Sequence, residues 1–193
     1  MKCQNVLIYK EGADQAAALC QELRNRGYDV SYYQLGAVQT EPDLMVLCPD
    51  LSGLELLYDG EIGTGHDFDR MELLLSEKLF EMKDCIDSVA PLMQEGGKRI
   101  AFLTKEESSI SLCSDSEQFS EHILLSAENM LAKMTFNRLR PLGFTVRCFA
   151  PSTGVTAMQY FLQDFCYDPK EPTVHSEENR LVLRNGQFVE LPW

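Results

Sequence analysis

Apolar and polar residues along the first fifty positions follow the pattern of strand, helix, strand. A short apolar run at 6–9 has the length of a strand, and further runs lie at 30–34 and 44–48. Between the first two runs, apolar residues recur at helical spacing until Gly27, which is typical of a helix end. These helical positions are Ala16, Leu19, Cys20 and Leu23. The spacing predicts a βαβ unit with parallel strands and a right-handed crossover.

Two long amphipathic helices are predicted in the middle of the chain. Apolar residues recur at helical spacing over 71–90 and over 124–139, and Pro141 and Gly143 end the second helix. Strands are expected at 100–103 and 145–150. The segments between these elements, 51–67 and 105–119, are glycine-rich and serine-rich respectively and are expected to be largely loops.

The last third of the chain predicts one more helix, at 155–165, and a hairpin. Apolar runs at 181–183 and 188–191 flank Asn185-Gly186, a pair favoured in tight hairpin turns. The whole pattern predicts one domain over 1–193. Its expected fold class is α/β, a three-layer, Rossmann-like, doubly wound parallel sheet.

Composition narrows the classes of partner. The chain has 193 residues, a formal net charge of −13 and a pI near 4.6, so its field repels nucleic acids and anionic membranes. Seven cysteines without a C-x-x-C pair indicate reduced thiols. The sequence shows neither a secretory signal nor a membrane-spanning stretch, and we expect a cytoplasmic protein.

Several strings of the sequence resemble the short-chain dehydrogenase/reductase family over nearly the whole chain. The first strand, cofactor turn, helix and second strand of the family are similar to NVLIYKEGADQAAALCQELRNRGYDV. Its fourth strand, its fifth strand and its following helix, turn and strand are similar to DLMVLCPDLSG, SVAPLMQEGGKRIAFLT and SAENMLAKMTFNRLRPLGFTVRCFAPS. The resemblance implies a shortened form of that fold, without the third strand, because 34–43 is too short to hold it. It also implies that the lid following the sixth strand is missing.

The resemblance places the three glycines of the family's G-x-x-x-G-x-G cofactor turn at Lys10, Asp14 and Ala16. Those glycines let the backbone approach a dinucleotide pyrophosphate. Asp14 would put a negative charge beside the phosphates, while Lys10 and Gly12 could form an altered anion site. Gln34 and Asp50, at the ends of the next two strands, are further candidates for cofactor binding.

The family's Tyr-x-x-x-Lys pair falls on Glu121 and Leu125, its Asn on Lys78, and its Ser on Lys105, or on Ser108 or Ser109 if the loop has grown. In the family, the tyrosine exchanges a proton with substrate and the lysine lowers its pKa. An ionised glutamate and a leucine cannot perform these roles. Glu121 with His122 could form a new acid/base pair, but a solvent-facing first helical turn is the preferred interpretation. Three isolated histidines do not indicate a metal site.

The two long helices keep more apolar positions than one sheet-facing stripe needs. In the resembled family they form a four-helix interface between subunits, so we expect a homodimer or tetramer, with Met71, Leu75, Leu125 and Met134 on the second face. The leading functional hypothesis is a pseudoenzyme or repurposed protein without a cofactor, acting as a scaffold or as the partner of an active homologue. The alternatives are an oxidoreductase using NAD or NADP at an altered site, and a module that senses a nucleotide or other small molecule.

Overall fold

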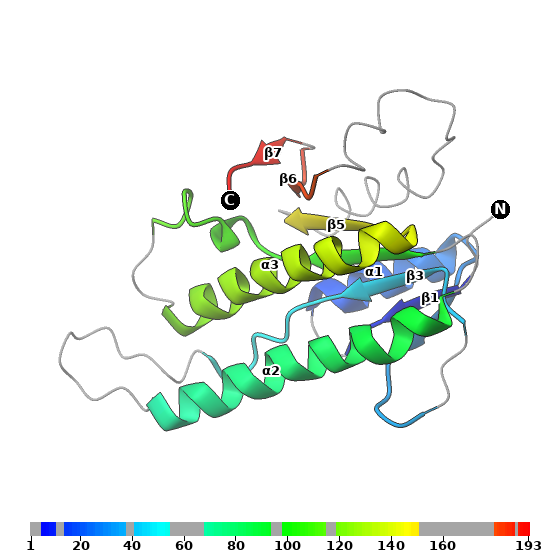
Figure 1. Ribbon diagram of the computed structural model, residues 1–193, viewed down its shortest axis with the longest axis horizontal. Coiled ribbons are helices and arrows are strands. Elements are labelled where there is room, and N and C mark those ends of the chain that lie inside the picture. Colours follow the sequence, from blue (N-terminus) through cyan, green and yellow to red (C-terminus); the bar gives the residue numbers. More distant parts are fainter. Residues whose placement is uncertain are drawn as a thin grey trace.

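The computed structural model describes residues 5–10, 14–37, 41–54, 68–93, 98–114, 119–150, 180–187 and 189–193. Within these residues, seven strands form one sheet in the order β2-β1-β3-β4-β5-β6-β7 (Figure 1). The strands are β1 (Asn5–Ile8), β2 (Asp29–Tyr32), β3 (Leu44–Leu47), β4 (Arg99–Leu103), β5 (Thr145–Ala150), β6 (Leu183–Asn185) and β7 (Glu190–Leu191). All neighbouring pairs are parallel except β6 with β7. The predicted parallel sheet is confirmed.

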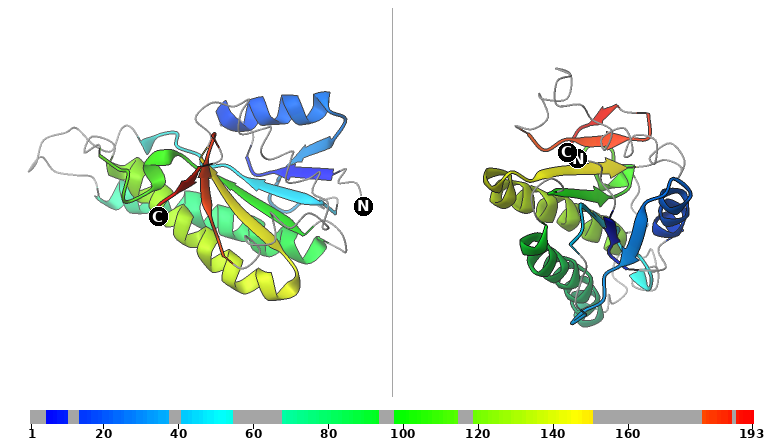
Figure 2. Two further views of the ribbon diagram at one scale, coloured as in Figure 1. Left: turned by 90° about the horizontal axis from the view of Figure 1, so that it is seen from above. Right: turned by 90° about the vertical axis from the view of Figure 1, so that its right-hand side faces the viewer.

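Helices cover both faces of the sheet. Helix α1 (Asp14–Asn25) lies on one face, and α2 (Phe68–Val89) and α3 (Phe119–Leu139) lie together on the other (Figure 2). Successive strand residues point to opposite faces, so each strand contributes to two cores. Ile8 packs in the cluster that includes α1, whereas Leu7 packs in the cluster that includes α2 and α3. This arrangement gives the three layers that the sequence predicts.

Glycine and proline end the helices where the sequence indicates. Gly27 and Gly143 follow α1 and α3 with φ of +85° and +86°, the left-handed conformation that glycine tolerates at the end of a helix. Pro91 and Pro141 lie in the short 3₁₀ turns η2 (Ala90–Leu92) and η4 (Arg140–Leu142), which close α2 and α3. These local signals fix the points at which the chain returns to β4 and β5.

The predicted hairpin near the C-terminal residues is present, with its turn one residue later than expected. Asn185 is the last residue of β6, and its Oδ1 accepts hydrogen bonds from the backbone N–H groups of Gln187 and Val189, each at 3.0 Å. Leu183 pairs with Leu191 across the hairpin. The asparagine side chain therefore holds the turn from its first position rather than from its centre.

The opposite edge of the sheet is β2. In the described part of the chain no strand pairs with its outer side, in keeping with the missing third strand expected from the short segment 34–43. The serine-rich segment contains one short 3₁₀ helix, η3 (Glu106–Ser108). The predicted helix at 155–165, the lid region and the glycines of 55–67 lie outside the described residues.

Three expectations from the sequence concern thiols, membrane-spanning helices and metal sites. Cys20, Cys48, Cys85 and Cys148 are buried free thiols, as expected, and burial raises the pKa of Cys85 to about 12, which keeps it protonated and unreactive. The described helices include none long and apolar enough to cross a membrane. Among the described residues, no cluster of His, Cys, Asp and Glu could hold a metal ion.

Candidate functional site

The carboxyl ends of β1 and β3 bring three of the predicted site residues together. Lys10 follows β1, Asp50 follows β3, and Lys78 lies on α2. Asp50 Oδ2 is 3.1 Å from Nζ of Lys10 and 3.1 Å from Nζ of Lys78. In open parallel sheets, ligands bind at this end of the strands. In this chain the Asp50 carboxylate, paired with Lys10 and Lys78, lies at this end of the sheet.

Two residues that the sequence analysis missed complete the cluster. Glu81 Oε2 lies 3.0 Å from Lys10 Nζ and accepts a 3.3 Å hydrogen bond from the Tyr9 hydroxyl. Glu81 is three residues after Lys78 on α2, so both side chains lie on one face of the helix. That spacing was visible in the sequence and could have indicated Glu81. We call Tyr9, Lys10, Asp50, Lys78 and Glu81 the crevice cluster.

Hydrogen bonds set the charges in this cluster. Burial alone would raise the pKa of Asp50, but hydrogen bonds from Ser52, Lys78 and Lys10 hold it well below its usual range. The Asp50 side chain is 26% exposed and that of Lys78 only 8%, so water screens their attraction weakly. Burial, and secondarily the Glu81 carboxylate, raise the pKa of Tyr9 far above its ordinary value. Tyr9 is therefore a poor source of the proton that a reductase tyrosine supplies.

A second ion pair joins the residues at the family's Ser and Tyr positions. Lys105, just beyond β4, places Nζ 2.5 Å from Oε1 of Glu121 in the first turn of α3. The Glu121 side chain is 17% exposed. The expected solvent-facing first turn is thus wrong for Glu121, because β4 and α3 bring a lysine against it. Both ring nitrogens of His122 are buried, with no hydrogen-bond partner among the described residues, so the geometry does not pair it with Glu121.

Packing buries three of the other candidate residues. Leu125, at the family's Lys position, is fully buried. Ser108 and Ser109 are also buried, and their hydroxyls lack a hydrogen-bond partner in the described part of the structure. Gln34 is exposed two residues beyond β2. The structure therefore does not bring Ser108 or Leu125 into one site with Lys10.

Two described residues in and after the turn that follows β1 carry side chains where the family's pattern has glycine. Lys10 has φ of +61°, a conformation typical of glycine, but its side chain reaches Asp50 and Glu81. The methyl of Ala16 is fully buried in the core against β1. Gly12 and the side chain of Asp14 lie outside the described residues, although Asp14 is the first residue of α1. The described residues of this turn do not fit the close backbone approach that the family's glycines provide.

Comparison of the sequence with protein-family models gives no match, and none is found among curated proteins. Solved structures are similar in fold. A carbonyl reductase from Pseudomonas aeruginosa PAO1 in complex with NADP aligns with a TM-score of 0.69 at 12% identity, over 98% of this chain and 100% of that one. A short-chain dehydrogenase/reductase from Serratia marcescens, in a double-mutant form, aligns with a TM-score of 0.66 at 15% identity, over 97% and 98%.

At such identities the likeness reports backbone arrangement, since fold and chemistry vary independently. It fits the mostly parallel sheet with helices on both of its faces. The fold-level resemblance seen in the sequence is confirmed. The chain has the fold of the short-chain dehydrogenases/reductases.

Proposed function

We propose that this chain is a repurposed, non-catalytic protein with the short-chain dehydrogenase/reductase fold, acting as an oligomeric scaffold or as the partner subunit of an active homologue. One observation carries the proposal. Residues at one position of the family's cofactor turn and at the positions of its Asn, Ser and Tyr form ion pairs with other side chains of this chain. We also propose a cytoplasmic location, which the buried free thiols support.

The ion pairs oppose the chemistry of a reductase. A carbonyl substrate needs a proton donor beside its oxygen, and Glu121 accepts from Lys105 instead. The side chain of Lys78 is buried, and its ammonium group already forms an ion pair with Asp50. Breaking either pair to receive a ligand would leave a partly buried charge without its partner, which costs free energy.

An oxidoreductase that uses NAD or NADP at an altered site is the second candidate. The similar Pseudomonas aeruginosa carbonyl reductase is in complex with NADP, and Lys10, whose side chain is 37% exposed, is a cation at the end of β1. In this alternative the phosphates would compete with Asp50 and Glu81 for Lys10, and Lys78, Lys105 or Ser108 would serve the substrate.

A turnover assay separates these functions. The purified chain is mixed with NADH or NADPH and a panel of aldehydes and ketones, and loss of reduced-nicotinamide absorbance is followed. We expect no loss above the enzyme-free rate, while the Pseudomonas aeruginosa carbonyl reductase is run as the positive control. Consumption that disappears in a Lys105→Met variant would contradict the proposal and support the oxidoreductase.

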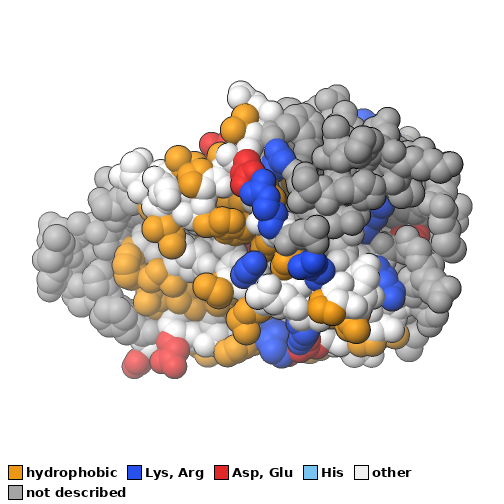
Figure 3. Space-filling view, turned by 45° about the horizontal axis from the view of Figure 1, so that its top comes forward, with side chains coloured by type: hydrophobic (Ala, Val, Ile, Leu, Met, Phe, Trp, Pro, Cys, Tyr) orange, Lys and Arg blue, Asp and Glu red, His pale blue; other side chains and the backbone are white. Residues whose placement is uncertain are grey.

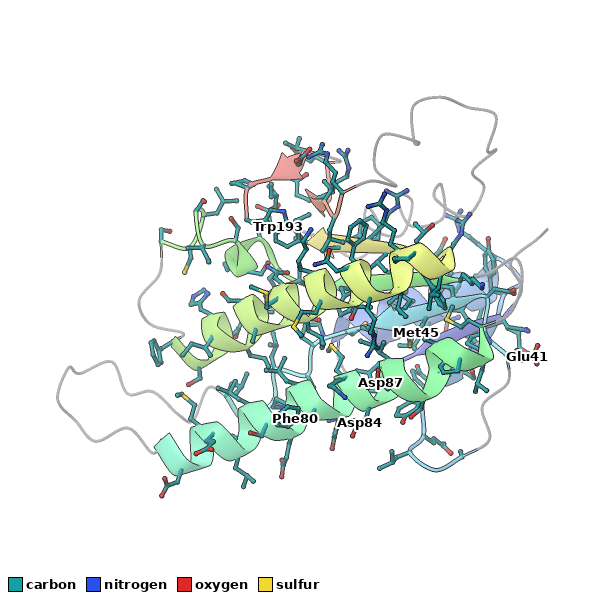
Figure 4. All side chains as sticks on the ribbon, in the orientation of Figure 1. Glu41, Met45, Phe80, Asp84, Asp87 and Trp193 are labelled. Carbon is teal, nitrogen blue, oxygen red and sulfur yellow. The ribbon has the colours of Figure 1, made fainter. Side chains whose placement is uncertain are left out.

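The proposed homodimer or tetramer uses the exposed face of α2 and α3. Leu73 and Phe80 on α2 and Met134 on α3 are large apolar side chains that are 58%, 61% and 63% exposed. Figure 4 labels Phe80 on α2, near Asp84 and Asp87. A hollow of about 430 Å³ next to Met134 is lined by residues of both helices, Ile86 and Leu131 among them. These features support burial against a second copy.

Of the four residues predicted to lie on this face, one is exposed, two are partly buried and one is fully buried. Met134 is exposed as expected, but the prediction for Leu125 is wrong because that side chain is fully buried. Met71 and Leu75 are partly buried against Leu54 and Leu124. The chain segment around Leu54 packs on the amino-terminal half of α2 and covers those positions.

A Phe80→Asp, Met134→Asp double variant tests the interface. Two carboxylates on the apolar face should convert the oligomer into a monomer, because charges buried at an interface without partners are strongly unfavourable. Mass is measured by sedimentation or light scattering. Leu35→Asp is the control, because Leu35 is 81% exposed beyond β2, and it should leave the mass unchanged. A monomeric wild-type chain at high protein concentration would contradict the proposal.

A further inference from the structure

A pocket lies between α3, the segment after η3 and the C-terminal residues. Its volume is about 330 Å³, within the usual range for small-molecule sites. Lys105, Glu121 and Leu125 do not line it, whereas Ser108, an alternative position of the family's serine, does. The lining residues are Ser108, Ile110, Ser126, Asn129, Met130, Lys133, Leu181 and Trp193.

The wall of the pocket contains a buried polar group without a partner. Ser108 is 2% exposed, and its hydroxyl forms no hydrogen bond with a described residue. Asn129 donates a 3.1 Å hydrogen bond from Nδ2 to the Ser108 carbonyl, which fixes the backbone there. A buried hydroxyl that remains unpaired costs free energy, and rotation of the Ser108 side chain toward the pocket would let it donate to a ligand oxygen.

The rim of the pocket is apolar and exposed. Ile110, Met130 and Trp193 are 77%, 61% and 42% exposed. The Ser111 hydroxyl donates a 3.1 Å hydrogen bond to the Trp193 carbonyl and so holds the tail against this wall. The space-filling view shows apolar side chains gathered on one part of the surface, with lysines and arginines beside them (Figure 3). Covering the rim with an apolar molecule would remove this surface from water.

The side chains that line the pocket differ in charge from the acidic chain as a whole. The chain has a formal net charge of −13, yet the lining contains no acidic side chain and one lysine, Lys133. Lys133 forms no ion pair with a described residue, and its Nζ lies 5.1 Å from the centre of the Phe136 ring. A cation beside an apolar hollow matches a ligand that combines an apolar body with a carboxylate.

We propose that this pocket binds a small apolar carboxylate, such as a medium-chain alkanoate. The alkyl body lies against Ile110, Met130, Leu181 and Trp193, and the carboxylate lies near Lys133 with the Ser108 hydroxyl available to donate to it. The pocket does not use the crevice cluster. A failure of ligand binding in this pocket would therefore leave the proposed non-catalytic function unaffected, and the reverse also holds.

Fluorescence of Trp193, the single tryptophan of the chain, gives a direct readout at the pocket. The full chain is titrated with octanoate and, separately, with 1-octanol, with thermal shift as a second readout. Octanoate should change the fluorescence saturably and raise the unfolding temperature, and 1-octanol should bind at least about five-fold more weakly because it lacks the charge.

Variants locate the binding. Lys133→Gln should weaken octanoate binding about five-fold and leave 1-octanol unchanged, and Ser126→Leu should fill the pocket and abolish both. Lys98→Gln is the matched control, since Lys98 also lies over a phenylalanine ring, that of Phe144, but does not line the pocket. Absence of saturable binding to the folded wild-type chain at millimolar octanoate would overturn the proposal. Equal octanoate affinity in Lys133→Gln and Lys98→Gln would overturn it as well.

Discussion

Replacing Glu128 by methionine should raise the free energy of unfolding by about 3 kcal/mol near pH 8 and by about 1 kcal/mol near pH 5. Glu128 on α3 is 1% exposed, and neither carboxylate oxygen has a hydrogen-bond partner among the described residues. Methionine has a similar length, packs adaptably and needs no partner. Chemical denaturation at several pH values measures the difference.

The pH dependence follows from the protonation of Glu128. Burial raises the pKa of its carboxyl well above the usual value, and the nearby thiols are those of Cys48 and Cys148. Above the ordinary glutamate pKa the unfolded chain loses this proton while the folded chain keeps it. Stability therefore falls as pH rises, by up to about 1.4 kcal/mol per pH unit, until the folded pKa is reached.

Glu121→Gln is the matched control for Glu128. Glu121 is on the same helix, seven residues earlier, but it is paired with Lys105. Its substitution should not stabilise the protein, because the charge that is removed has a partner. An unchanged or lower stability of Glu128→Met at both pH values would show that the Glu128 carboxyl is satisfied in the folded protein.

Replacing Asp50 by asparagine should lower the free energy of unfolding by about 2 kcal/mol near neutral pH. The change removes the negative charge between Lys10 and Lys78, and the buried Lys78 ammonium loses its ion pair with residue 50. Asp50 has a lowered pKa in the folded protein, so its contribution is present above the ordinary aspartate pKa. The difference between wild type and Asp50→Asn should disappear as pH falls through the lowered pKa.

A double-mutant cycle with Lys78→Met tests the cause of this loss. Removing the buried cation together with its partner should recover most of the stability, because methionine can fill the position of the lysine stem. The coupling energy between the two sites should be about 1 to 3 kcal/mol. Additive effects would indicate that Asp50 acts through Ser52 and the turn rather than through Lys78.

Much of the fold could be predicted because its signals are local. The apolar run before α1, Gly27, Pro141 and Gly143 each act within a few residues, and the structure confirms the elements that they delimit. The boundaries of β2 and β4 moved by one or two residues, since strand ends depend on pairing with neighbours. The parallel pairing of β6 with β5 joins residues that are far apart in the sequence, and no local pattern predicts it.

The candidate site was less predictable because it depends on how side chains pair in space. The resemblance placed Lys78, Lys105 and Glu121 at functional positions, but only the folded chain shows that Lys105 reaches Glu121. Glu128 was missed although it lies three residues after Leu125 and four before Ala132, both fully buried. That helical spacing indicates burial, whereas a glutamate is usually assigned to the surface.

Titration of the purified chain with NADPH and with NADH, followed by nicotinamide fluorescence and checked by thermal shift, shows whether this chain binds a dinucleotide. Because Lys10, Asp50, Lys78 and Glu81 bind one another where a dinucleotide would lie, neither cofactor should bind saturably at millimolar concentration. The Pseudomonas aeruginosa carbonyl reductase, whose structure with NADP is similar in fold, serves as the positive control. Saturable binding at micromolar concentration, with a matching rise in unfolding temperature, would contradict the account.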